Sequence, residues 1–555
     1  MEDTIKIYCK NNSKYQEFPA GISLLEVYRM MNIQLSSQPT CVKVNNKTES
    51  LLYRCYKPKD IEFIGVSDPS GMRTYVRSLC CILAKSVHDL FPEGTLYIEH
   101  SLSKGYYCEI ETGRRITEED VILVKKRMQE IVKADLPFEA HDEQTPVVVD
   151  LFRKNGRDDK ALLLETVREV YSKYVSLDGY VDDFYGCLLP RTSWVYLFDI
   201  VKYYDGLLLR VPDAAAPNAL QAFVKQTKMM SAFQEFRQFQ KAIDMTQIGE
   251  LNQGIQGGEI STVVKVAEIL QEKKISQMAD EISRRFNEGV RIVLIAGPSS
   301  SGKTTFCKRL QIQLLANTLR PIAISLDDYY VDRELTPLDE YGEYDYESLY
   351  AIDLKQFKED LQQILAGEKV ALPTYDFPTG KRVYKGNTVR LQPNSVLVME
   401  GIHAMNPELT AGIPPEAIYK IYVSALTSIA LDNHNWIPTT DNRLIRRIVR
   451  DYQFRGYSAK ETISRWPSVR KGEDKWIFPF QENADDMFNS AMLYELAALR
   501  KIAEPMLKEV TQMDKEFSEA HRLLKFLRYF NYVDESELPN TSLLREFVGG
   551  SSFRY

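Results

Sequence analysis

Residues 290–304 join an apolar run to a glycine-bounded loop, and this pairing constrains the fold more than any other feature of the chain. The run VRIVLIAG is short and almost continuously apolar, as in a parallel strand buried on both faces. It leads directly into GPSSSGKT, residues 297–304, which fits the pattern GxxxxGK[ST]. Phe306, Leu310 and Leu314 follow at helical spacing. A strand, a loop and a helix in this order predict a parallel α/β sheet.

The loop at 297–304, called the phosphate loop below, carries the chemistry of a triphosphate site. Its glycines let the backbone curl so that N–H groups point at phosphates. Lys303 can reach the β- and γ-phosphates, and Thr304 can bind Mg²⁺. The residues expected to bind ATP are Gly297, Ser299, Ser300, Ser301, Gly302, Lys303, Thr304 and Thr305. A chance turn or a loop that no longer binds nucleotide are the alternatives, and the intact Lys303 and Thr304 disfavour both.

Two acids end strand-like runs downstream of the loop. PIAISLDDYY places Asp327 and Asp328 at its end, and VLVMEGI ends in Glu400. In open α/β sheets, ligands bind at the carboxyl ends of strands. We expect Asp327 to orient the attacking hydroxyl and accept its proton, and Glu400 to hold the metal with Thr304. Each acid could instead be a turn or cap carboxylate.

The segment 441–475 is rich in arginine. Arg443, Arg447 and Arg450 recur at helical spacing, and Arg446 lies beside them. Several guanidinium groups on one helix can neutralise phosphate charge and stabilise the transition state. A solvated helix face with ion pairs is the alternative. After a phosphate loop and two strand-end acids, a mobile lid is favoured.

Residues 285–490 resemble the uridine kinase and phosphoribulokinase family. GPSSSGKTT, SLDDYY, YDYESLYAID, PTYDFPTGKR, VLVMEGI and DNRLIRRIVRDYQFRG match its blocks in order. The resemblance implies ATP and Mg²⁺ as cofactors and makes Asp327, Lys303 and the three arginines catalytic. It implies that Tyr330, Glu347, Tyr375 and Arg382 bind the acceptor. Gly380 stands where the family has a base-contacting histidine, so a pyrimidine preference does not carry over.

The N-terminal half resembles part of another family. EFPAGISLLEVYR looks like a TGS domain, in which Ser23 and Glu26 have capping-box spacing. CVKV and LLYRCY flank Asn45-Asn46 and predict a hairpin. RSLCCILAKSVHDLFPEG and FYGCLLPRTS resemble the editing domain of threonyl-tRNA synthetases. The expected metal ligands of that domain are replaced by Arg77, Cys81, Phe184 and Leu188. Editing chemistry and its metal are therefore not expected.

The composition is that of an ordinary globular protein, with 44% hydrophobic residues in 555. A formal net charge of -7 provides no bulk positive field for a polyanion. The 8 cysteines form no CxxC pair, which favours reduced thiols in the cytoplasm. The N-terminus lacks a signal-peptide pattern, and no apolar run is long enough for a membrane span.

We therefore predict a multidomain chain of α/β and α+β parts. The expected segments are a β-grasp-like TGS domain at 1–67, an α+β editing-like domain at 68–230, a helical linker at 231–284, a P-loop α/β kinase domain with a parallel sheet at 285–490, and a helical extension at 491–555. The favoured function is a kinase acting on the 5′-hydroxyl of a nucleoside. The alternatives are a kinase of a phosphorylated sugar and an RNA- or ribosome-associated regulatory protein with a nucleotide switch. The oligomeric state is left open.

Overall fold

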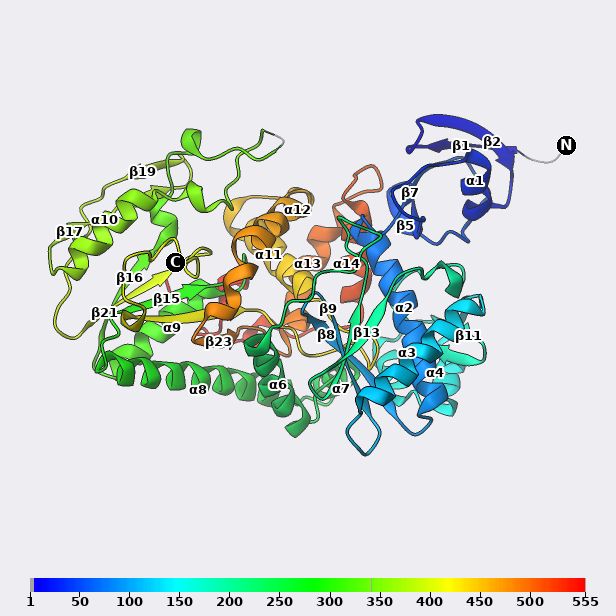
Figure 1. The fold of residues 1–555 in the computed structure, drawn as a ribbon, viewed down its shortest axis with the longest axis horizontal. Coiled ribbons are helices and arrows are strands. Elements are labelled where there is room, and N and C mark those ends of the chain that lie inside the picture. The colour runs from blue at the N-terminus through cyan, green and yellow to red at the C-terminus, as the bar shows by residue number, and fades with distance from the viewer. Residues whose placement is uncertain (1–3, 341, 555) are drawn as a thin grey trace.

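A parallel sheet organises the C-terminal half of the computed structural model, which describes residues 4–340 and 342–554 (Figure 1). Its strand order is β16-β21-β15-β22-β23, and every neighbouring pair is parallel. The strands are β15 (Ile292–Ala296), β16 (Arg320–Ser325), β21 (Ser395–Glu400), β22 (Ile418–Ser424) and β23 (Asp486–Asn489). The predicted parallel α/β sheet is confirmed.

β15 is buried along its whole length because helices cover both faces of the sheet. Val293 and Ile295 point into one apolar core, and Ile292 and Leu294 point into the other. This alternation explains why the run is continuously apolar. The helices of this half are α8 (Ile260–Phe286), α9 (Lys303–Ala316), α10 (Leu354–Leu365), α11 (Thr439–Arg455), α12 (Ala459–Trp476), α13 (Glu495–Lys508), α14 (Phe517–Leu527) and α15 (Arg545–Val548).

The last stretch of the chain is part of the core around α9 and α11. Leu523, Phe526, Leu543 and Phe547 are buried in the same cluster as Phe306 and Leu310 of α9. α15 packs against α11, and α13 packs against both α11 and α14. The helical extension is therefore built into the C-terminal half rather than appended to it.

The N-terminal region is a mixed sheet with the strand order β2-β1-β7-β4-β5 and one helix. Its elements are β1 (Thr4–Cys9), β2 (Lys14–Pro19), β3 (Ile22–Ser23), α1 (Leu24–Met31), β4 (Cys41–Val44), β5 (Lys47–Glu49), β6 (Arg54–Cys55) and β7 (Lys59–Ile64). Ser23 caps α1, and the Glu26 carboxylate accepts the Ser23 N–H in return, so the predicted capping box is confirmed.

The predicted hairpin at Asn45-Asn46 forms, but its second strand is not LLYRCY. β4 pairs with β5, which lies immediately after the turn, whereas β6 pairs with β3. Asn45 and Asn46 both adopt positive φ, as a two-residue hairpin turn requires. The tight turn brings Lys47–Glu49 against β4 before the more apolar run is reached, and that local geometry outweighs apolar composition.

The second region has the strand order β13-β14-β9-β8, flanked by α2 and α3, and a smaller sheet β10-β11-β12. Its elements are α2 (Pro69–Leu90), β8 (Thr95–Leu102), β9 (Gly105–Glu111), α3 (Glu118–Lys133), β10 (Glu139–Gln144), α4 (Thr145–Lys154), α5 (Asp158–Val167), β11 (Tyr171–Leu177), β12 (Tyr180–Asp182), β13 (Asp199–Tyr203) and β14 (Gly206–Arg210). Helices α6 (Thr227–Ala242) and α7 (Ile248–Gln256) lead from it to α8.

Within residues 4–340 and 342–554, every helix is too short or too polar to span a bilayer. All eight cysteines are free thiols, and all except Cys187 are buried.

Candidate active site

The phosphate loop follows β15 directly and is shaped by two glycines. A Cβ on Gly297 would come within 2.0 Å of the Val423 carbonyl oxygen, so no larger residue fits there. Gly302 has φ +81, and a Cβ there would lie 2.4 Å from the Leu543 side chain. The hydroxyls of Ser300 and Ser301 are buried without a partner, although buried polar atoms normally have one. The loop is thus lined with polar groups that its own fold leaves unsatisfied.

Lys303, Thr304 and Glu400 meet at the carboxyl ends of β15 and β21, which are adjacent strands. The Thr304 Oγ1 donates to Glu400 Oε1 at 3.4 Å. Burial raises the pKa of Glu400 to about 7, although the nearby Lys303 ammonium lowers it. Burial also lowers the pKa of Lys303, which Glu400 and Asp327 oppose. A hydroxyl and a carboxylate are hard oxygen ligands, so this pair suits Mg²⁺ bound together with phosphate oxygens.

Asp327 lies in a short 3-10 turn, η2 (Leu326–Tyr329), directly after β16. Burial raises its pKa, while the charges of Lys303, Arg455 and Arg450 lower it. Asp327 is therefore a largely enclosed carboxylate beside the phosphate-loop lysine and the arginine helix. The sequence did not single out Arg455, which faces Asp327 from the last turn of α11.

Helix α11 presents arginines in two directions. Arg443 donates through Nε to the Ser299 carbonyl at 3.0 Å, and Arg447 donates through Nη1 to Ser299 Oγ at 2.9 Å. Arg450 binds Asp451 on its own helix. Arg446 is fully buried and pairs with Glu495 of α13, so it anchors the helix instead of facing the loop. The helix therefore lies against the phosphate loop through Arg443 and Arg447.

Two carboxylates from distant parts of the chain accept N–H groups of the phosphate loop. Glu473 of α12 accepts the Ser299 N–H at 3.1 Å and also pairs with Arg443. Glu546 of α15 accepts the Thr305 N–H at 3.0 Å and the Thr305 hydroxyl at 2.7 Å. Backbone N–H groups at this helix start are the ones that favour an anion. Glu546 lies outside every predicted motif, and Glu473 lies in the arginine-rich segment 441–475 without any pattern that marks it.

Glu546→Gln is expected to tighten ATP binding by about tenfold, which corresponds to about 1.4 kcal/mol. The Glu546 carboxylate holds an N–H that suits a phosphate, and glutamine keeps its shape without its charge. Calorimetric titration with ATP and Mg²⁺ measures the change. Glu509→Gln, an exposed position on the same C-terminal extension, is the matched control and should leave the affinity unchanged. Weaker binding by Glu546→Gln would show that Glu546 supports the loop instead of competing with nucleotide.

The predicted acceptor residues fall into two groups. Tyr330, Tyr375 and Glu347 lie near Asp327: the rings of Tyr330 and Tyr375 are 5.6 Å apart, and Glu347 is electrostatically close to Lys303 and Asp327. Burial raises the pKa of Glu347 to about 7, and its Oε2 has no partner. A buried carboxylate oxygen without a partner beside Asp327 suits the hydroxyl of a ligand.

Arg382 forms the second group, because it is engaged in the scaffold. It lies opposite Tyr375 in the hairpin of β18 (Thr374–Asp376) and β19 (Lys381–Val383). Its Nη1 donates to Asp353 Oδ2 at 2.9 Å, and Asp353 caps α10. The remaining short strands, β17 (Val370–Ala371) and β20 (Thr388–Val389), pair beside this hairpin.

Gly380 is packed against an arginine. It has φ +69, and a Cβ there would come within 2.7 Å of Arg333 Nε. Arg333 also donates its backbone N–H to the Gly380 carbonyl at 2.8 Å. The structure therefore places a guanidinium where the side chain of residue 380 would project. The departure from the family pattern at Gly380 is visible in the sequence, whereas only the fold brings Arg333 beside it.

Binding of ATP with Mg²⁺ at pH 6.5 is expected to release roughly three-quarters of a proton, because a metal ligand must be ionised. The pKa of Glu400 is raised to about 7, so most of this carboxyl is protonated at that pH. Because the folded state binds this proton more tightly than the unfolded state, the contribution of Glu400 to the free energy of unfolding falls as pH rises from about 4.5 to 7. Calorimetry in two buffers of different ionisation enthalpy measures the protons released.

Glu400→Gln should abolish this proton release. Glu347→Gln should retain it, because Glu347, whose pKa is also raised to about 7, lies on the acceptor side. Equal release in wild type and Glu400→Gln would contradict the assignment of Glu400 to the metal.

The part of the chain that contains the parallel sheet resembles known proteins. Residues 292–496 match the model of the phosphoribulokinase / uridine kinase family. The uridine kinase of Staphylococcus aureus strain JH9 is 31% identical over 195 residues, which are 35% of this chain and 84% of that protein. The chain belongs to the phosphoribulokinase/uridine kinase family. The match places the phosphate loop, Asp327, Glu400 and α11 of this family member inside its family domain.

The N-terminal part of this family member has other relatives. The threonine–tRNA ligase of Syntrophomonas wolfei is 29% identical over 191 residues, which are 34% of this chain and 30% of the ligase. The chain spans about 30% of the length of the threonine–tRNA ligases that it matches. Among solved structures, one described as a possible uridine kinase from Bacillus stearothermophilus shares 20% identity, with a TM-score of 0.26 over 39% of this chain and 100% of that chain.

In the editing-like region, Arg77 and Cys81 lie on α2, and Phe184 and Leu188 lie on the segment after β12. Among the described residues, no group of three His, Cys, Asp or Glu side chains is arranged to hold a metal ion. The Arg77 guanidinium contacts the ring of Tyr185. Burial raises the pKa of the Cys81 thiol, which keeps it protonated.

Proposed function

We propose that this protein transfers the γ-phosphoryl group of ATP to a hydroxyl of a small acceptor, in the first instance the 5′-hydroxyl of a nucleoside. The observation that carries the proposal is the convergence of Lys303, Asp327 and Glu400 at the carboxyl ends of strands β15, β16 and β21. Phosphoryl transfer requires that the negative charge of the phosphoryl group be stabilised and that the proton of the acceptor hydroxyl be accepted. An ammonium and two carboxylates provide the groups for both tasks.

In this proposal, each group of residues has a role that follows from its position in the site. The phosphate-loop N–H groups and Lys303 hold the phosphates, and Arg443 and Arg447 bring positive charge to the same loop. Thr304 and Glu400 would hold Mg²⁺, which when bound draws negative charge from the phosphate oxygens. Asp327 accepts a hydrogen bond from the acceptor hydroxyl and takes its proton as the new O–P bond forms. The bond between the γ-phosphorus and the β-phosphate oxygen breaks, and ADP leaves.

Helices α11 and α12 are proposed to act as the lid. Both lie against the phosphate loop through Arg443 and Glu473, and Gly472 approaches Glu347 so closely that a Cβ would lie 2.3 Å from its side chain. A lid that touches both the ATP side and the acceptor side can exclude water when both are bound. This arrangement would limit wasteful hydrolysis of ATP.

A phosphorylated sugar is the second candidate acceptor, and Arg333 favours it. Arg333 packs against Gly380 on the acceptor side. Burial raises the pKa of Tyr375, and the charge of Arg333 lowers it. Its guanidinium donates to the Phe377 carbonyl, and its backbone N–H donates to the Gly380 carbonyl. A guanidinium suits an anionic group on the acceptor, and a phosphate is the natural match.

The test is an ADP-release screen with ATP and Mg²⁺ against nucleosides and sugar phosphates. The nucleoside proposal expects acceptor-dependent ADP release with one or more nucleosides and insensitivity to Arg333→Ala. The sugar-phosphate candidate expects release with a phosphorylated sugar and loss in Arg333→Ala. Release with neither class, in protein that binds ATP, would refute both acceptors.

We propose a cytoplasmic location, which free thiols fit, and leave RNA as a partner to be tested. The similarity to threonine–tRNA ligases supports testing it through the N-terminal region. tRNA binding that weakens steeply with salt would favour an RNA-associated role. If tRNA does not bind, or if its binding does not depend on salt, the RNA-associated role is not supported and the kinase proposal stands by itself.

A further inference from the structure

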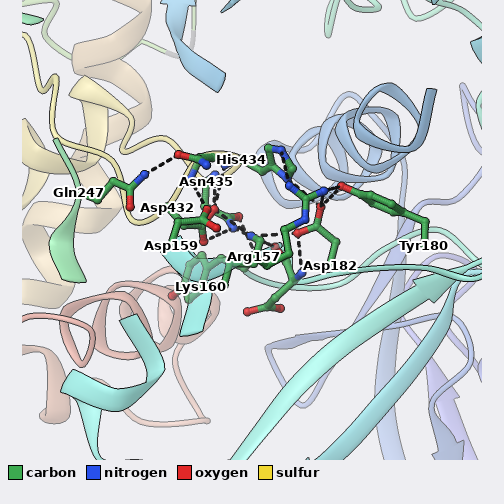
Figure 2. Close-up of polar contacts among 12 residues, drawn as sticks. Arg157, Asp159, Lys160, Tyr180, Asp182, Gln247, Asp432, His434 and Asn435 are labelled. Carbon is green, nitrogen blue, oxygen red and sulfur yellow. Dashed lines mark hydrogen bonds and ion pairs between the residues drawn. The ribbon is translucent and has the colours of Figure 1, made fainter. Parts of the chain in front are cut away.

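A turn from the C-terminal half is embedded in the editing-like region. Residues 431–436 lie between β22 and α11, and Asp432 and Asn435 form an isolated bridge that closes the turn. Figure 2 shows His434, Asn435 and Asp432 pointing into a group of charged side chains from α5 and β12. The turn comes from the family domain, whereas α5 and β12 lie more than 240 residues earlier in the chain; Gln247, at the start of α7, also donates to Asn433 Oδ1.

The contacts between the turn and this region form one buried network. Lys160 Nζ lies 2.8 Å from Asp432 Oδ1 and 2.9 Å from Asp182 Oδ1. His434 Nδ1 lies 2.7 Å from Asp182 Oδ2. Asp182 is fully buried, and Lys160, Asp432 and His434 are each at most 3% exposed. Charges so far from water persist only when each has a partner, so this network requires the turn to be seated.

The backbone of the turn is held as well. Asn433 donates its N–H to Asp159 Oδ2 at 2.9 Å, and its carbonyl accepts the Ile98 N–H at 2.8 Å. Asn435 donates through Nδ2 to the Asp183 carbonyl at 2.9 Å. The Asn433 backbone and the Asn435 side chain therefore both fix the position of the turn.

The network occupies the place of the replaced metal ligands. Phe184 stands at one of those positions, and its ring stacks against His434 at 6.1 Å with an angle of 9°. Cys81 stands at another of those positions, where burial and the charge of Asp182 raise the pKa of its thiol and the charge of Lys160 lowers it. Two of the four replaced ligand positions, Phe184 and Cys81, therefore lie beside the turn.

The turn leads straight into the arginine helix. Four residues after Asn435, α11 begins at Thr439 and carries Arg443 and Arg447 to Ser299 of the phosphate loop. A second connection runs in parallel: Arg522 of α14 binds Asp441 in the first turn of α11 at 2.6 Å. Glu519 beside Arg522 binds Arg73 of α2 at 2.9 Å. Both connections join the editing-like region to the start of α11.

We infer that the editing-like region acts as a socket for residues 431–436 and thereby positions α11 over the phosphate loop. Asp432 and His434 are positioning residues, since they act on nucleotide only through α11. This inference rests on the proposed function for its catalytic consequence, but not for the mechanical coupling itself. It gives the region a role that needs neither a metal nor a ligand of its own.

His434→Ala in the full chain tests the coupling by two measurements. Hydrogen–deuterium exchange of the α11 amides should be about tenfold faster, and the Kd for ATP should rise by about tenfold. Val148→Ala is the matched control: it opens a cavity in the separate cluster around Phe152 and does not touch the turn. His434→Gln, which can still donate to Asp182, should recover most of both effects.

Trp436→Leu is the second variant, for the case in which His434→Ala does not fold. The Trp436 ring packs against Tyr106 with the centroids 4.7 Å apart and the planes tilted by 53°. The substitution leaves the ionic network intact, so a smaller change in the same direction is expected. If both variants match Val148→Ala in exchange and ATP affinity, the inference is overturned. Faster α11 exchange without any phosphotransfer in wild type would sustain the socket and refute the proposed kinase function instead.

Discussion

Asp327→Asn is expected to lower kcat by about 10²- to 10⁴-fold while ATP affinity stays within about twofold. Asparagine preserves the size of the side chain at the end of β16 but cannot accept the acceptor proton. In the proposed mechanism the carboxylate belongs to the acceptor side of the site, and the phosphate-loop groups proposed to hold ATP are unchanged. Initial rates with saturating ATP, together with calorimetric ATP binding, separate the two effects.

Asp328→Asn is the matched control, because it makes the same chemical change one residue away. The Asp328 carboxylate accepts the Tyr375 N–H at 3.1 Å, and an amide oxygen can accept the same bond. Its kcat should stay within about threefold of wild type. Near-normal turnover by Asp327→Asn, or an equal loss in both variants, would remove Asp327 from the proposed role.

Lys160→Met is expected to destabilise the protein by about 3–5 kcal/mol. Lys160 is 2% exposed and neutralises Asp182 and Asp432, so its loss leaves two carboxylates buried without their shared cation. Urea titration followed by intrinsic fluorescence and by exchange of the α5 and turn amides measures the change locally. Because the chain has several domains, the midpoint of the first transition is the quantity to compare.

Lys173→Met makes the same substitution at an exposed pair and serves as the control. The Lys173 side chain is 71% exposed and lies 4.0 Å from Asp142, so its loss should change the free energy of unfolding by less than about 0.5 kcal/mol. A loss of less than about 1 kcal/mol in Lys160→Met would mean that the buried network adds little to stability.

The parts of the site that sequence could predict are those that lie in local patterns. The phosphate loop, Asp327 and Glu400 each follow a buried apolar run, and parallel strands bring their carboxyl ends to one edge. The roles of these residues remain proposals, but their convergence was visible in the spacing. The parallel sheet itself followed from the apolar character of the same runs.

The parts that could not be predicted depend on contacts between distant segments. Glu473 and Glu546 reach the phosphate loop from 174 and 241 residues away, and no sequence pattern marks either of them. Helical spacing grouped four arginines on α11 but could not show that Arg446 turns toward Glu495 in the core. Arg333 was missed for the same reason, because only the fold brings it beside Gly380.

The burial of α14 and α15 in the core around α9 has a consequence for biosynthesis. A ribosome adds about 5–20 residues per second, so roughly 10–50 s separate the emergence of the phosphate loop from that of Glu546. During this interval Phe306 and Leu310 lack part of the apolar surface that covers them in the finished protein. The nascent chain would therefore expose apolar surface of the nucleotide domain until α14 and α15 have been synthesised, and incomplete cores of this kind are prone to aggregation.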